Sequence, residues 1–539
     1  GTHTLGILAG GYRGDVQAGI MSDSQAAPVS TVANPYYGVA TEAHLAAVCG
    51  DLYDRLIAEG IERILDYSYY KQEPCVISLS LGSNTGVHSA KSPMSQYLDQ
   101  AAREAIIVVS SGNEGDVPLS LVKDLSENDL EAKSFILPTA VEGIRAGQVY
   151  MYSEAPFEMQ AVIYNKSRDR VSFRMPIVDG QVQGGALYYC SSDFAESEYD
   201  IIAQPFANAF RGYVGVGWDY DELSEMYLTI MDYYTQDIDE NGNYLLGFIV
   251  TGQHGQHIEC FCDGFYTVLD SYGVEGWDTG STDMSISDMA CANDILVVGS
   301  YNTGDTYGAL DGNTYNFNGQ FTVGKISPFS SYGRLNDGRS LPHVCGPGAV
   351  IVSSCSQYYV DNKDNKVDIN ALCARADEDG RVNYWCPAMG TSMSAPYVAG
   401  CIALWLEADP TLTIADVKEI INATAVRDAE VEAGNPVQWG AGKFDAYSGR
   451  KEVILRSSLN GIEADSTVAL MVSTSDNRHF EIFLGGASTL NAAVYNTSGA
   501  IVAHEKCNGD ELALDLSHLT SGIYIINVND TMSRRVIVN

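Results

Sequence analysis

The spacing of apolar residues along the chain predicts alternating strands and helices in its first part. Residues 56–70 carry apolar side chains at helical spacing, whereas residues 76–82 and 105–109 are continuous apolar runs. A short apolar run at 45–49 predicts another buried strand before the helix. Strand, helix and strand in succession indicate a βαβ unit and therefore a parallel sheet. The fold class predicted for this part is α/β.

The spacing of apolar residues changes between residues 116 and 283. Five segments alternate or run apolar without helices between them: 148–152, 157–165, 171–177, 227–232 and 245–252. This pattern predicts an inserted antiparallel β domain, jelly-roll-like, rather than further βαβ units. Its role is open between shaping access to a site, binding a partner and rigidifying the fold.

A buried strand is predicted at 290–300, a buried helix beginning at Ser392 with apolar residues as far as Leu404, and a further helix at 410–424. The pattern in this part is therefore again that of an α/β fold. From about residue 453 the chain alternates short strands and turns, with hairpins predicted at 492–502 and between 516–528 and 534–538. This alternation of short strands and turns predicts a C-terminal β-sandwich. The predicted domains are therefore 1–115 with 284–452, the insert 116–283, and 453–539.

Composition and charge disfavour two classes of protein, those that bind nucleic acids and those that span a membrane. The chain has 539 residues with 31 basic and 69 acidic side chains, a net charge of −38. A phosphate backbone would be repelled, so we expect no nucleic-acid partner. No apolar run reaches the roughly 18–20 residues of a membrane span. The N-terminus has no signal-peptide pattern, so we expect a mature, truncated or cytosolic chain.

Residues 390–400 read Gly-Thr-Ser-Met-Ser-Ala-Pro-Tyr-Val-Ala-Gly. Gly390 permits a close backbone approach, and Ser392 stands where a buried helix is predicted to begin, with Pro396 expected in its first turn. Unpaired backbone N–H groups at such a helix start suit a nucleophile whose attack creates an oxyanion. The alternative is an ordinary N-capping serine.

The full eleven-residue string closely resembles the active-site serine segment of the subtilisin-like serine proteases. The resemblance implies a parallel sheet flanked by helices, a protein or peptide substrate, and Ser392 as nucleophile. Residues 110–115 resemble the family's oxyanion-hole loop, which implies that the Asn113 side chain donates to the oxyanion; taken alone, Asn113 indicates only a turn. The resemblance also implies backbone substrate-binding positions: Ser80, Leu81, Gly82, Ser111 and Gly112.

The N-terminal residues resemble the second half of the family's histidine motif. His3 matches its second His, which the family does not use as base, and the family's order is Asp, His, Ser. We therefore expect the triad His and Asp to lie upstream of Gly1, and the chain 1–539 to be inactive. The resemblance covers about 1–115 and 284–452.

Two further resemblances concern the added domains. An insertion directly after the oxyanion-hole segment resembles the clostridial spore-germination subtilases. The C-terminal region resembles the sorting domain of type IX secretion, which implies secretion machinery as a partner and a secreted or cell-surface protein of a Gram-negative bacterium. The alternative function is a non-catalytic protease-fold binding or adhesion protein. An esterase or lipase is disfavoured because Ser392 lacks the Gly-x-Ser-x-Gly elbow.

The chain has 12 cysteines in no framework spacing. Cys49, Cys75, Cys291, Cys345 and Cys401 lie in apolar or Gly-rich stretches, and most are expected to be buried and free. Cys355, Cys373 and Cys386 flank a loop, and a disulfide among them is open.

Metal ligation is considered at two places. His254, His257, Cys260 and Cys262 are residue types that suit zinc, but a strand at 256–261 would place His257 on the opposite face from the cysteines, which disfavours a site. Structural calcium is common in the family and stays open. No loop of EF-hand type is present, and Asp361, Asp364 and Asp368 are expected to form a solvated charged loop.

Overall fold

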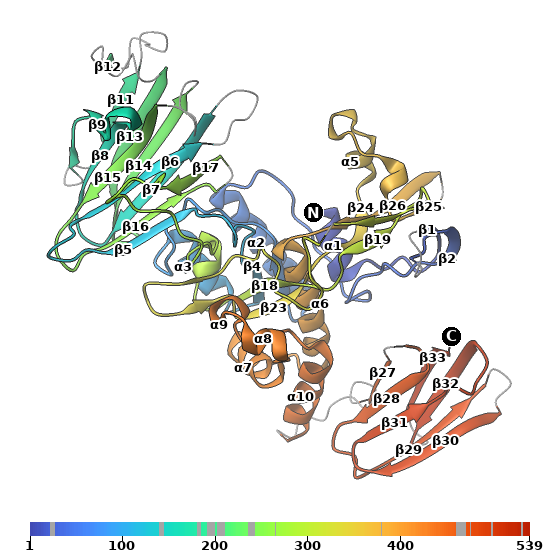
Figure 1. Cartoon of the computed structure of the whole chain (residues 1–539). Helices are drawn as coiled ribbons and strands as arrows, with labels where there is room; N and C mark the ends of the chain where they lie inside the picture. Colours follow the sequence, from blue (N-terminus) through green and yellow to red (C-terminus); the bar gives the residue numbers. More distant parts are fainter. Residues whose placement is uncertain are drawn as a thin grey trace.

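Figure 1 presents a computed structural model of the chain, with a central α/β body, a group of long strands and a separate group of C-terminal strands. The structure describes residues 1–21, 27–138, 145–179, 185–190, 200–201, 211–235, 243–264, 266–317, 319–378, 380–459, 470–474, 476–496, 500–529 and 532–538.

A sheet of four parallel strands forms the centre, in the order β23-β18-β4-β3. Its members are β3 (Val76–Leu79), β4 (Ile106–Ser110), β18 (Leu296–Asn302) and β23 (Val344–Ala349). Helix α3 (Pro93–Ala101) connects β3 to β4 and completes a βαβ unit, whereas the predicted unit lacks its first strand at 45–49. All five residues of β4 are buried, as expected of a strand covered on both faces.

Helices cover both faces of this sheet. Helix α3 and α2 (Asp54–Lys71) contribute apolar side chains to one hydrophobic cluster, whereas α6 (Thr391–Ala408) packs on the other side with two more helices. Those two are α7 (Ile414–Thr424) and α10 (Ala446–Leu459). Helix α1 (Thr2–Ala9) lies against α6. The remaining helices are α5 (Gln357–Asp361), α8 (Ala429–Ala433) and α9 (Pro436–Trp439).

An antiparallel sheet lies beside α1, in the order β2-β1-β25-β26-β24. Its strands are β1 (Asp15–Gly19), β2 (Val29–Ala33), β24 (Ile351–Cys355), β25 (Ala374–Glu378) and β26 (Arg381–Ala388). Strand β26 leads directly into α6, so this sheet supports the start of that helix (Figure 1). Two short pairs complete the body: β19 (Thr306–Gly308) with β20 (Thr314–Asn316), and β21 (Gly333–Arg334) with β22 (Ser340–Leu341).

The strands between β4 and β18 form two further sheets, and we call residues 120–270 the β insert. One sheet holds β6 (Glu131–Pro138), β8 (Glu158–Asn165), β9 (Arg170–Arg174), β10 (Val178–Asp179), β15 (Tyr244–Thr251) and β17 (Thr267–Asp270). The other holds β5 (Ser120–Asp124), β7 (Arg145–Ser153), β11 (Gly185–Cys190), β12 (Asp200–Ile201), β13 (Gly212–Asp221), β14 (Met226–Thr235) and β16 (His257–Cys262). Apart from the parallel pair β11–β12, every pairing is antiparallel.

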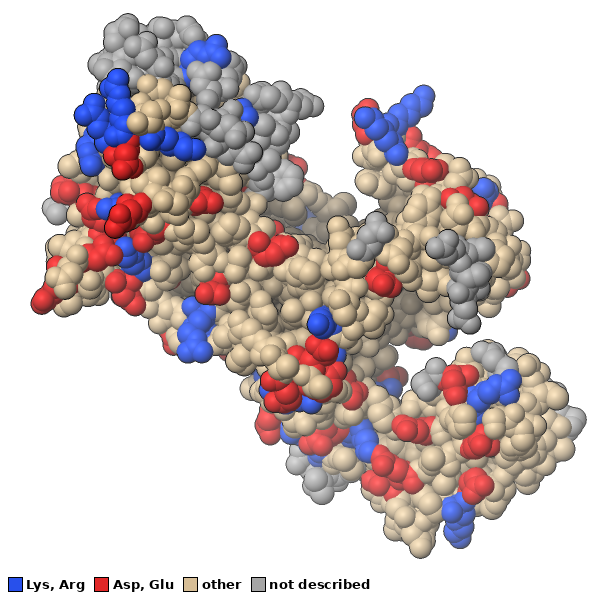
Figure 2. Space-filling view, viewed as in Figure 1, with Lys and Arg blue, Asp and Glu red and all other residues tan. Residues whose placement is uncertain are grey.

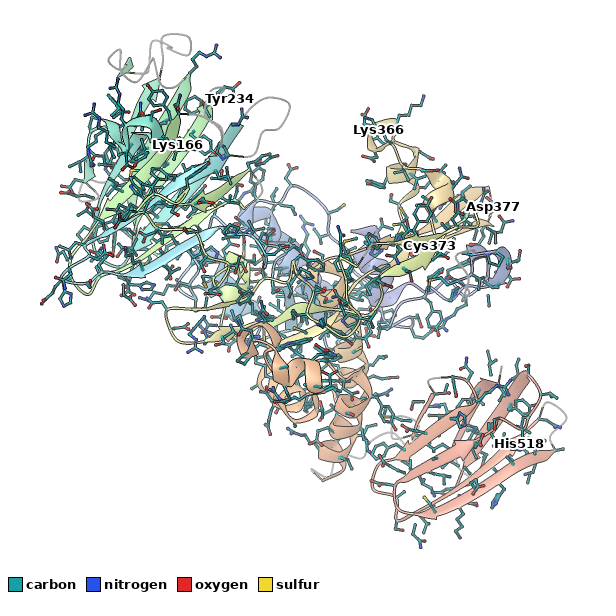
Figure 3. All side chains as sticks on the ribbon, viewed as in Figure 1. Lys166, Tyr234, Lys366, Cys373, Asp377 and His518 are labelled. Carbon is teal, nitrogen blue, oxygen red and sulfur yellow. The ribbon has the colours of Figure 1, made fainter. Side chains whose placement is uncertain are left out.

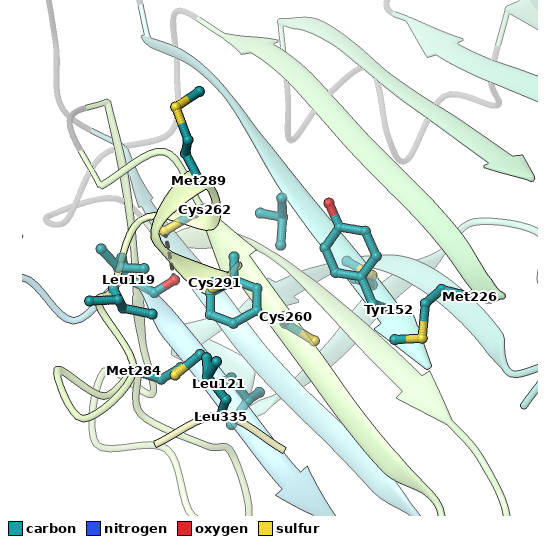
Figure 4. Packing of buried hydrophobic residues seen from close by; sticks show 14 of the residues in the cluster. Leu119, Leu121, Tyr152, Met226, Cys260, Cys262, Met284, Met289, Cys291 and Leu335 are labelled. Carbon is teal, nitrogen blue, oxygen red and sulfur yellow. Dashed lines mark hydrogen bonds between the residues drawn. The ribbon is translucent and has the colours of Figure 1, made fainter. Parts of the chain in front are cut away.

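The β insert and the α/β body share one hydrophobic core. Cys260 and Cys262 of β16 are fully buried and belong to the same cluster as Met284, Met289 and Cys291, which precede β18. Figure 4 shows these side chains packed together, with the Cys262 thiol donating a hydrogen bond to the carbonyl of Leu119 at 3.3 Å. The insert is therefore packed against the body rather than tethered beside it.

The C-terminal residues form two antiparallel sheets. One contains β27 (Leu470–Thr474), β28 (His479–Leu484) and β31 (Glu511–Asp515). The other contains β29 (Thr489–Tyr495), β30 (Ile501–Asn508), β32 (Gly522–Val528) and β33 (Met532–Val538). Both predicted hairpins, β29–β30 and β32–β33, are present, although residues 497–499 of the first lie outside the described residues.

Several sequence predictions differ from the structure. Residues 45–49 form no strand, and the side chains of Leu45 and Val48 are 44% and 51% exposed. The strand predicted at 290–300 begins only at Leu296, because the Asp99 carboxylate takes the backbone N–H groups of Asn293 and Asp294. Cys49 is exposed rather than buried.

Charge is unevenly distributed over the surface. Figure 2 shows Lys and Arg side chains gathered near the place where Figure 1 labels β9, and the exposed residues of that segment are Lys166, Arg168, Arg170 and Arg174. Acidic side chains are spread more widely over the visible face. None of the helices in the described part of the chain has both the length and the apolar character needed to cross a membrane.

Candidate active site

Ser392 is the second residue of α6, as the sequence predicts. Gly390 stands immediately before the helix with φ of 140°, and a Cβ there would lie 3.3 Å from Oδ1 of Asn113. This backbone conformation favours glycine and allows the chain to approach Asn113 closely. Because α6 packs against all four strands of the parallel sheet and is buried on most faces, the half-buried Ser392 is held in a fixed position.

Pro396 lies beyond the first helical turn, which corrects the sequence prediction. The helix begins at Thr391, so Pro396 is in its second turn and provides no N–H for the carbonyl of Ser392 four residues earlier. That carbonyl instead accepts a hydrogen bond from the Ser80 hydroxyl at 3.0 Å. Because the proline leaves the Ser392 carbonyl without a helical partner, the hydroxyl of Ser80, just beyond β3, can donate to it.

The side chain of Asn113 is held by the residue that precedes Ser392. Its Oδ1 accepts the backbone N–H of Thr391 at 2.8 Å. A backbone N–H can only donate, so this contact assigns the amide oxygen to Thr391 and leaves Nδ2 as a donor. Nδ2 has no hydrogen-bond partner among the described residues. An unused amide donor therefore stands beside the start of α6.

These residues line one pocket of about 200 Å³. Its lining residues are Ser80, Leu81, Gly82, Ser83, Asn84, Ser110, Gly112, Asn113, Glu114, Ser287 and Ser392. The predicted site residues thus meet here with one exception. Ser111 lies behind the pocket, fully buried, where its carbonyl accepts the backbone N–H of Ser287 at 2.9 Å.

The sequence analysis missed Ser83, Asn84, Glu114 and Ser287. Nothing in the local pattern around Ser287 signals a site, since this residue follows the β insert and reaches the pocket only through the tertiary fold. Its Oγ would lie 1.9 Å from a Cβ added at Gly82. Glu114 could have been found from its position next to Asn113, whose backbone N–H it accepts at 2.7 Å.

A buried carboxylate lies next to the pocket. Asp288 accepts the backbone N–H of Ser83 at 3.0 Å and its own neighbour's N–H, that of Met289, at 2.6 Å. Burial raises the pKa of Asp288 to about 6, and the hydrogen bond from Ser83 opposes this shift. The pocket lining contains Glu114 but no basic side chain, so the described surroundings of Ser392 favour positive or neutral groups.

Helix α1 runs alongside α6 with its N-terminal end toward the start of α6. The carbonyl of Leu8 lies beside Gly400, and Nε2 of His3 lies 3.1 Å from the carbonyl of Cys386, shortly before Gly390. Burial lowers the pKa of His3 below its ordinary value. Nε2 of His3 is therefore engaged with the carbonyl of Cys386. Among the described residues, none forms a hydrogen bond with the Ser392 hydroxyl.

The β insert supports the loop that follows the pocket edge. The Tyr152 hydroxyl donates to the carbonyl of Thr85 at 2.6 Å, and the buried His88 ring stacks on Phe261 with centroids 3.8 Å apart. Lys91 forms an ion pair with Glu154 at 3.1 Å. Residues 83–91 are therefore fixed between the parallel sheet and the insert.

The described side chains near Cys260 and Cys262 form ion pairs and hydrogen bonds instead of a zinc site. His257 lies between two carboxylates, Asp124 at 2.7 Å and Glu259 at 3.2 Å, on the face of β16 opposite Cys260 and Cys262. The predicted strand is present. In the described part of the chain, no cluster of three or more His, Cys, Asp or Glu side chains is arranged to hold a metal ion.

A family model described as the subtilase family matches residues 1–155 and 270–445, which flank most of the β insert and include Ser80, Asn113 and Ser392. The chain belongs to the subtilase family. A second model, a secretion-system C-terminal sorting domain, matches residues 476–539. This domain indicates that the subtilase is secreted or displayed at the cell surface.

Several known proteins resemble the chain at low identity. An uncharacterized protein of Aquifex aeolicus (strain VF5) is 25% identical over 150 residues, which are 28% of this subtilase and 58% of the relative, so the chain spans little more than half of that relative's length. The structure of the Clostridium perfringens CspB protease matches with a TM-score of 0.55 and 17% identity over 84% of this chain and 79% of its own. MycP1 with its N-terminal propeptide removed covers 83% of the chain at 14% identity, with a TM-score of 0.30.

Proposed function

We propose that the chain is the larger part of a secreted serine endopeptidase that hydrolyses peptide bonds through an acyl-enzyme on Ser392. The observation that carries the proposal is the pocket in which Ser392, at the start of α6, meets Asn113 with an unused Nδ2 donor. A serine beside two converging N–H donors suits attack on a carbonyl, because those donors stabilise the oxyanion that forms.

In the proposed mechanism, Oγ of Ser392 attacks the peptide carbonyl. The oxyanion is held by the Ser392 backbone N–H and by Nδ2 of Asn113. A His in a segment preceding Gly1 takes the Ser392 proton and returns it to the leaving amine, and an Asp further upstream orients that His. The direction of α1 supports this assignment, since its N-terminal end lies toward the start of α6.

Substrate binding is proposed along two backbone edges. Residues 80–82 and 111–112 follow β3 and β4 at the carboxyl end of the parallel sheet, on either side of the pocket. An extended peptide would add to these edges by main-chain hydrogen bonds, with the pocket selecting one side chain. Ser111 offers this edge no free backbone group, because its N–H donates to the Val298 carbonyl at 3.0 Å and its carbonyl accepts the Ser287 N–H at 2.9 Å.

We also propose how the domains contribute. The subtilase part comprises 1–115 and 284–452, with a jelly-roll-like insert at 116–283 and a C-terminal β-sandwich at 453–539. The sandwich acts as the export signal of a Gram-negative secretion system. The contacts of Tyr152 and Phe261 with residues 85 and 88 favour a supporting role for the insert over an independent one.

A fluorophosphonate probe that reacts with activated serines tests the proposal. The chain 1–539 is compared with a form extended upstream by its native residues, each with Ser392→Ala and with the control Ser394→Ala, whose hydroxyl is buried against the Gly346 carbonyl. We expect Ser392-dependent labelling only in the extended form. Ser392-dependent peptide hydrolysis by 1–539 would contradict the assignment of the base. Absence of labelling in both forms would favour the alternative, a non-catalytic binding or adhesion protein.

A further inference from the structure

Three cysteines gather on the antiparallel sheet that leads into α6. Cys355 ends β24, Cys386 lies in β26, and Cys373 immediately precedes β25 on the other side of β26. Figure 3 labels Cys373 at this sheet. All three are free thiols in the structure. The proposed mechanism uses none of them.

The register places Cys355 and Cys386 on the same face of the sheet. Cys386 pairs with Ser353, and Cys355 pairs with Tyr384, so the two cysteines are diagonal neighbours on adjacent antiparallel strands. Diagonal neighbours on one face lie about 7–8 Å apart, with their Cβ atoms somewhat closer, so a bond between these two requires a small approach of the two strands. The two thiols influence each other strongly enough to shift the pKa of both, in opposite directions. Both side chains are half-buried and therefore reachable from solvent.

We propose that Cys355 and Cys386 are a disulfide-forming pair, closed once the protein leaves the reducing compartment in which it is made. The C-terminal sorting domain indicates a secreted or cell-surface protein, and disulfides persist in such surroundings. The inference does not depend on catalysis by Ser392.

The reaction is thiol–disulfide exchange with an external disulfide, either that of an oxidoreductase or oxidised glutathione. The Cys355 thiolate attacks one sulfur of the oxidant, which breaks the oxidant's S–S bond and releases a thiolate. Cys386 loses its proton to solvent and attacks the mixed disulfide, forming the Cys355–Cys386 bond and releasing the second thiolate. Two electrons pass from the two cysteines to the oxidant, which is reduced to two thiols.

Cys355 is the attacking residue because its thiolate is stabilised locally. The interaction between the two side chains lowers the pKa of the Cys355 thiol and raises that of Cys386. Cys373 differs, because it is fully buried and its burial raises the pKa of the thiol to about 12. A fully buried thiol is not reached by an external disulfide, whereas Cys355 and Cys386 are half-buried. The pair is thus Cys355 with Cys386, although Cys373 flanks the same strand.

The linkage would act close to the proposed active site. It joins the two ends of the segment 356–385 and fastens β26, the strand from which Gly390 and Ser392 follow. The carbonyl of Cys386 also holds Nε2 of His3 at the start of α1. Closing the disulfide therefore restrains the start of α6 and the start of α1 together.

Mass spectrometry tests the pairing on the full chain. The reduced protein is incubated with oxidised glutathione, the remaining thiols are blocked with N-ethylmaleimide, and the digest is searched for linked peptides. We expect one linkage, Cys355–Cys386, and a loss of two titratable thiols. Cys373→Ser should keep the linkage, whereas Cys355→Ser and Cys386→Ser should each lose it. A Cys373–Cys386 linkage, or complete blocking of Cys355 and Cys386, would overturn the proposal.

Limited proteolysis provides a second measurement that does not rely on variants. Tyr358 and Tyr359 lie between the two cysteines and are 90% and 55% exposed, so chymotrypsin should cut there first. In the oxidised protein, the two fragments should migrate as one chain on a non-reducing gel and separate after reduction. Separation of the fragments without reductant would contradict the linkage.

Discussion

The Ser80 hydroxyl donates a hydrogen bond to the backbone carbonyl of Ser392 at 3.0 Å. This contact exists because Pro396 has no N–H to donate to the same carbonyl within α6. The residue that follows β3 is thereby fastened to the residue proposed as nucleophile. The pocket edge and the start of α6 are held at a fixed separation by one hydrogen bond.

Replacing Ser80 by Ala should destabilise the protein by about 1 kcal/mol, because the Ser392 carbonyl loses the one side-chain partner it has within the described part of the chain. Pro396→Ala supplies a backbone N–H that can bond to this carbonyl, so Ser80→Ala should cost less in that background. The free energy of unfolding, measured in urea for the four proteins of this double-mutant cycle, gives the coupling. Equal costs of Ser80→Ala in both backgrounds would disprove the proposed exchange of partners.

Asn113 allows its two amide groups to be tested separately. Asn113→Asp keeps an oxygen that accepts the Thr391 N–H but removes the Nδ2 donor and adds a negative charge. In the extended protein, we expect the rate of probe labelling and kcat to fall by at least about 10²-fold, the loss known for the corresponding donor in subtilisin. Thermal stability should change little, since the contact with Thr391 persists.

Asn113→Ala serves as the matched control. It removes both the donor and the acceptor, so it should lose activity to a similar degree and also lose stability by about 1 kcal/mol. Retention of full activity by Asn113→Asp would exclude the proposed oxyanion role.

The start of α6 could be predicted from sequence because its determinants are local. Gly390, Ser392 and the small apolar residues that follow specify a close approach and a buried helix whatever surrounds them. Helix α7 was predicted from 410 but begins at Ile414, where Thr413 and Asp416 form a capping box. This capping box is also a local signal, so the correct start of α7 could have been predicted from the sequence.

The pocket walls could not be predicted, because they depend on contacts between distant segments. Ser287 reaches Gly82 only after the β insert has been packed against residues 83–91. The prediction of a strand at 45–49 was wrong for a related reason. Apolar side chains indicate a strand only when a neighbouring strand pairs with them, and within the described residues β3 has β4 as its only paired neighbour.

His257 predicts a pH dependence of stability in the β insert. Its hydrogen bond to the buried Glu259, together with that to Asp124, raises the pKa of His257 to about 9, against an ordinary value of 6.5. The folded state therefore binds this proton more tightly than the unfolded state. The stabilisation is complete below pH 6.5 and is lost as the pH rises through 9.

The His257→Gln variant should be less stable than the wild type by about 1 to 3 kcal/mol at pH 6, and the difference should shrink at pH 10. Urea unfolding at the two pH values measures the change. His254→Gln, at an exposed neighbouring position, is the control and should show no such trend. A difference that grows with pH would contradict the assignment.

The contact between Gly82 and Ser287 sets the shape of the pocket. A Cβ at position 82 would lie 1.9 Å from Oγ of Ser287 and 3.0 Å from its Cβ, so Gly82→Ala must displace either the pocket edge or the residue opposite. We expect Gly82→Ala to cost about 1 to 3 kcal/mol in stability through overpacking. In the extended protein it should also raise KM for peptides, with less effect on probe labelling, because the probe needs less of the backbone edge.

Ser287→Gly removes both atoms with which the new methyl group collides, and the extended backbone at this position is open to glycine. The double variant Gly82→Ala/Ser287→Gly should therefore regain most of the stability and the KM lost in Gly82→Ala. Ser287→Gly alone should have a small effect, since it gives up two long hydrogen bonds, at 3.3 Å to the carbonyl of Ser83 and at 3.5 Å to Oδ1 of Asp288. Strictly additive losses in the double variant would show that the two residues do not meet across the pocket.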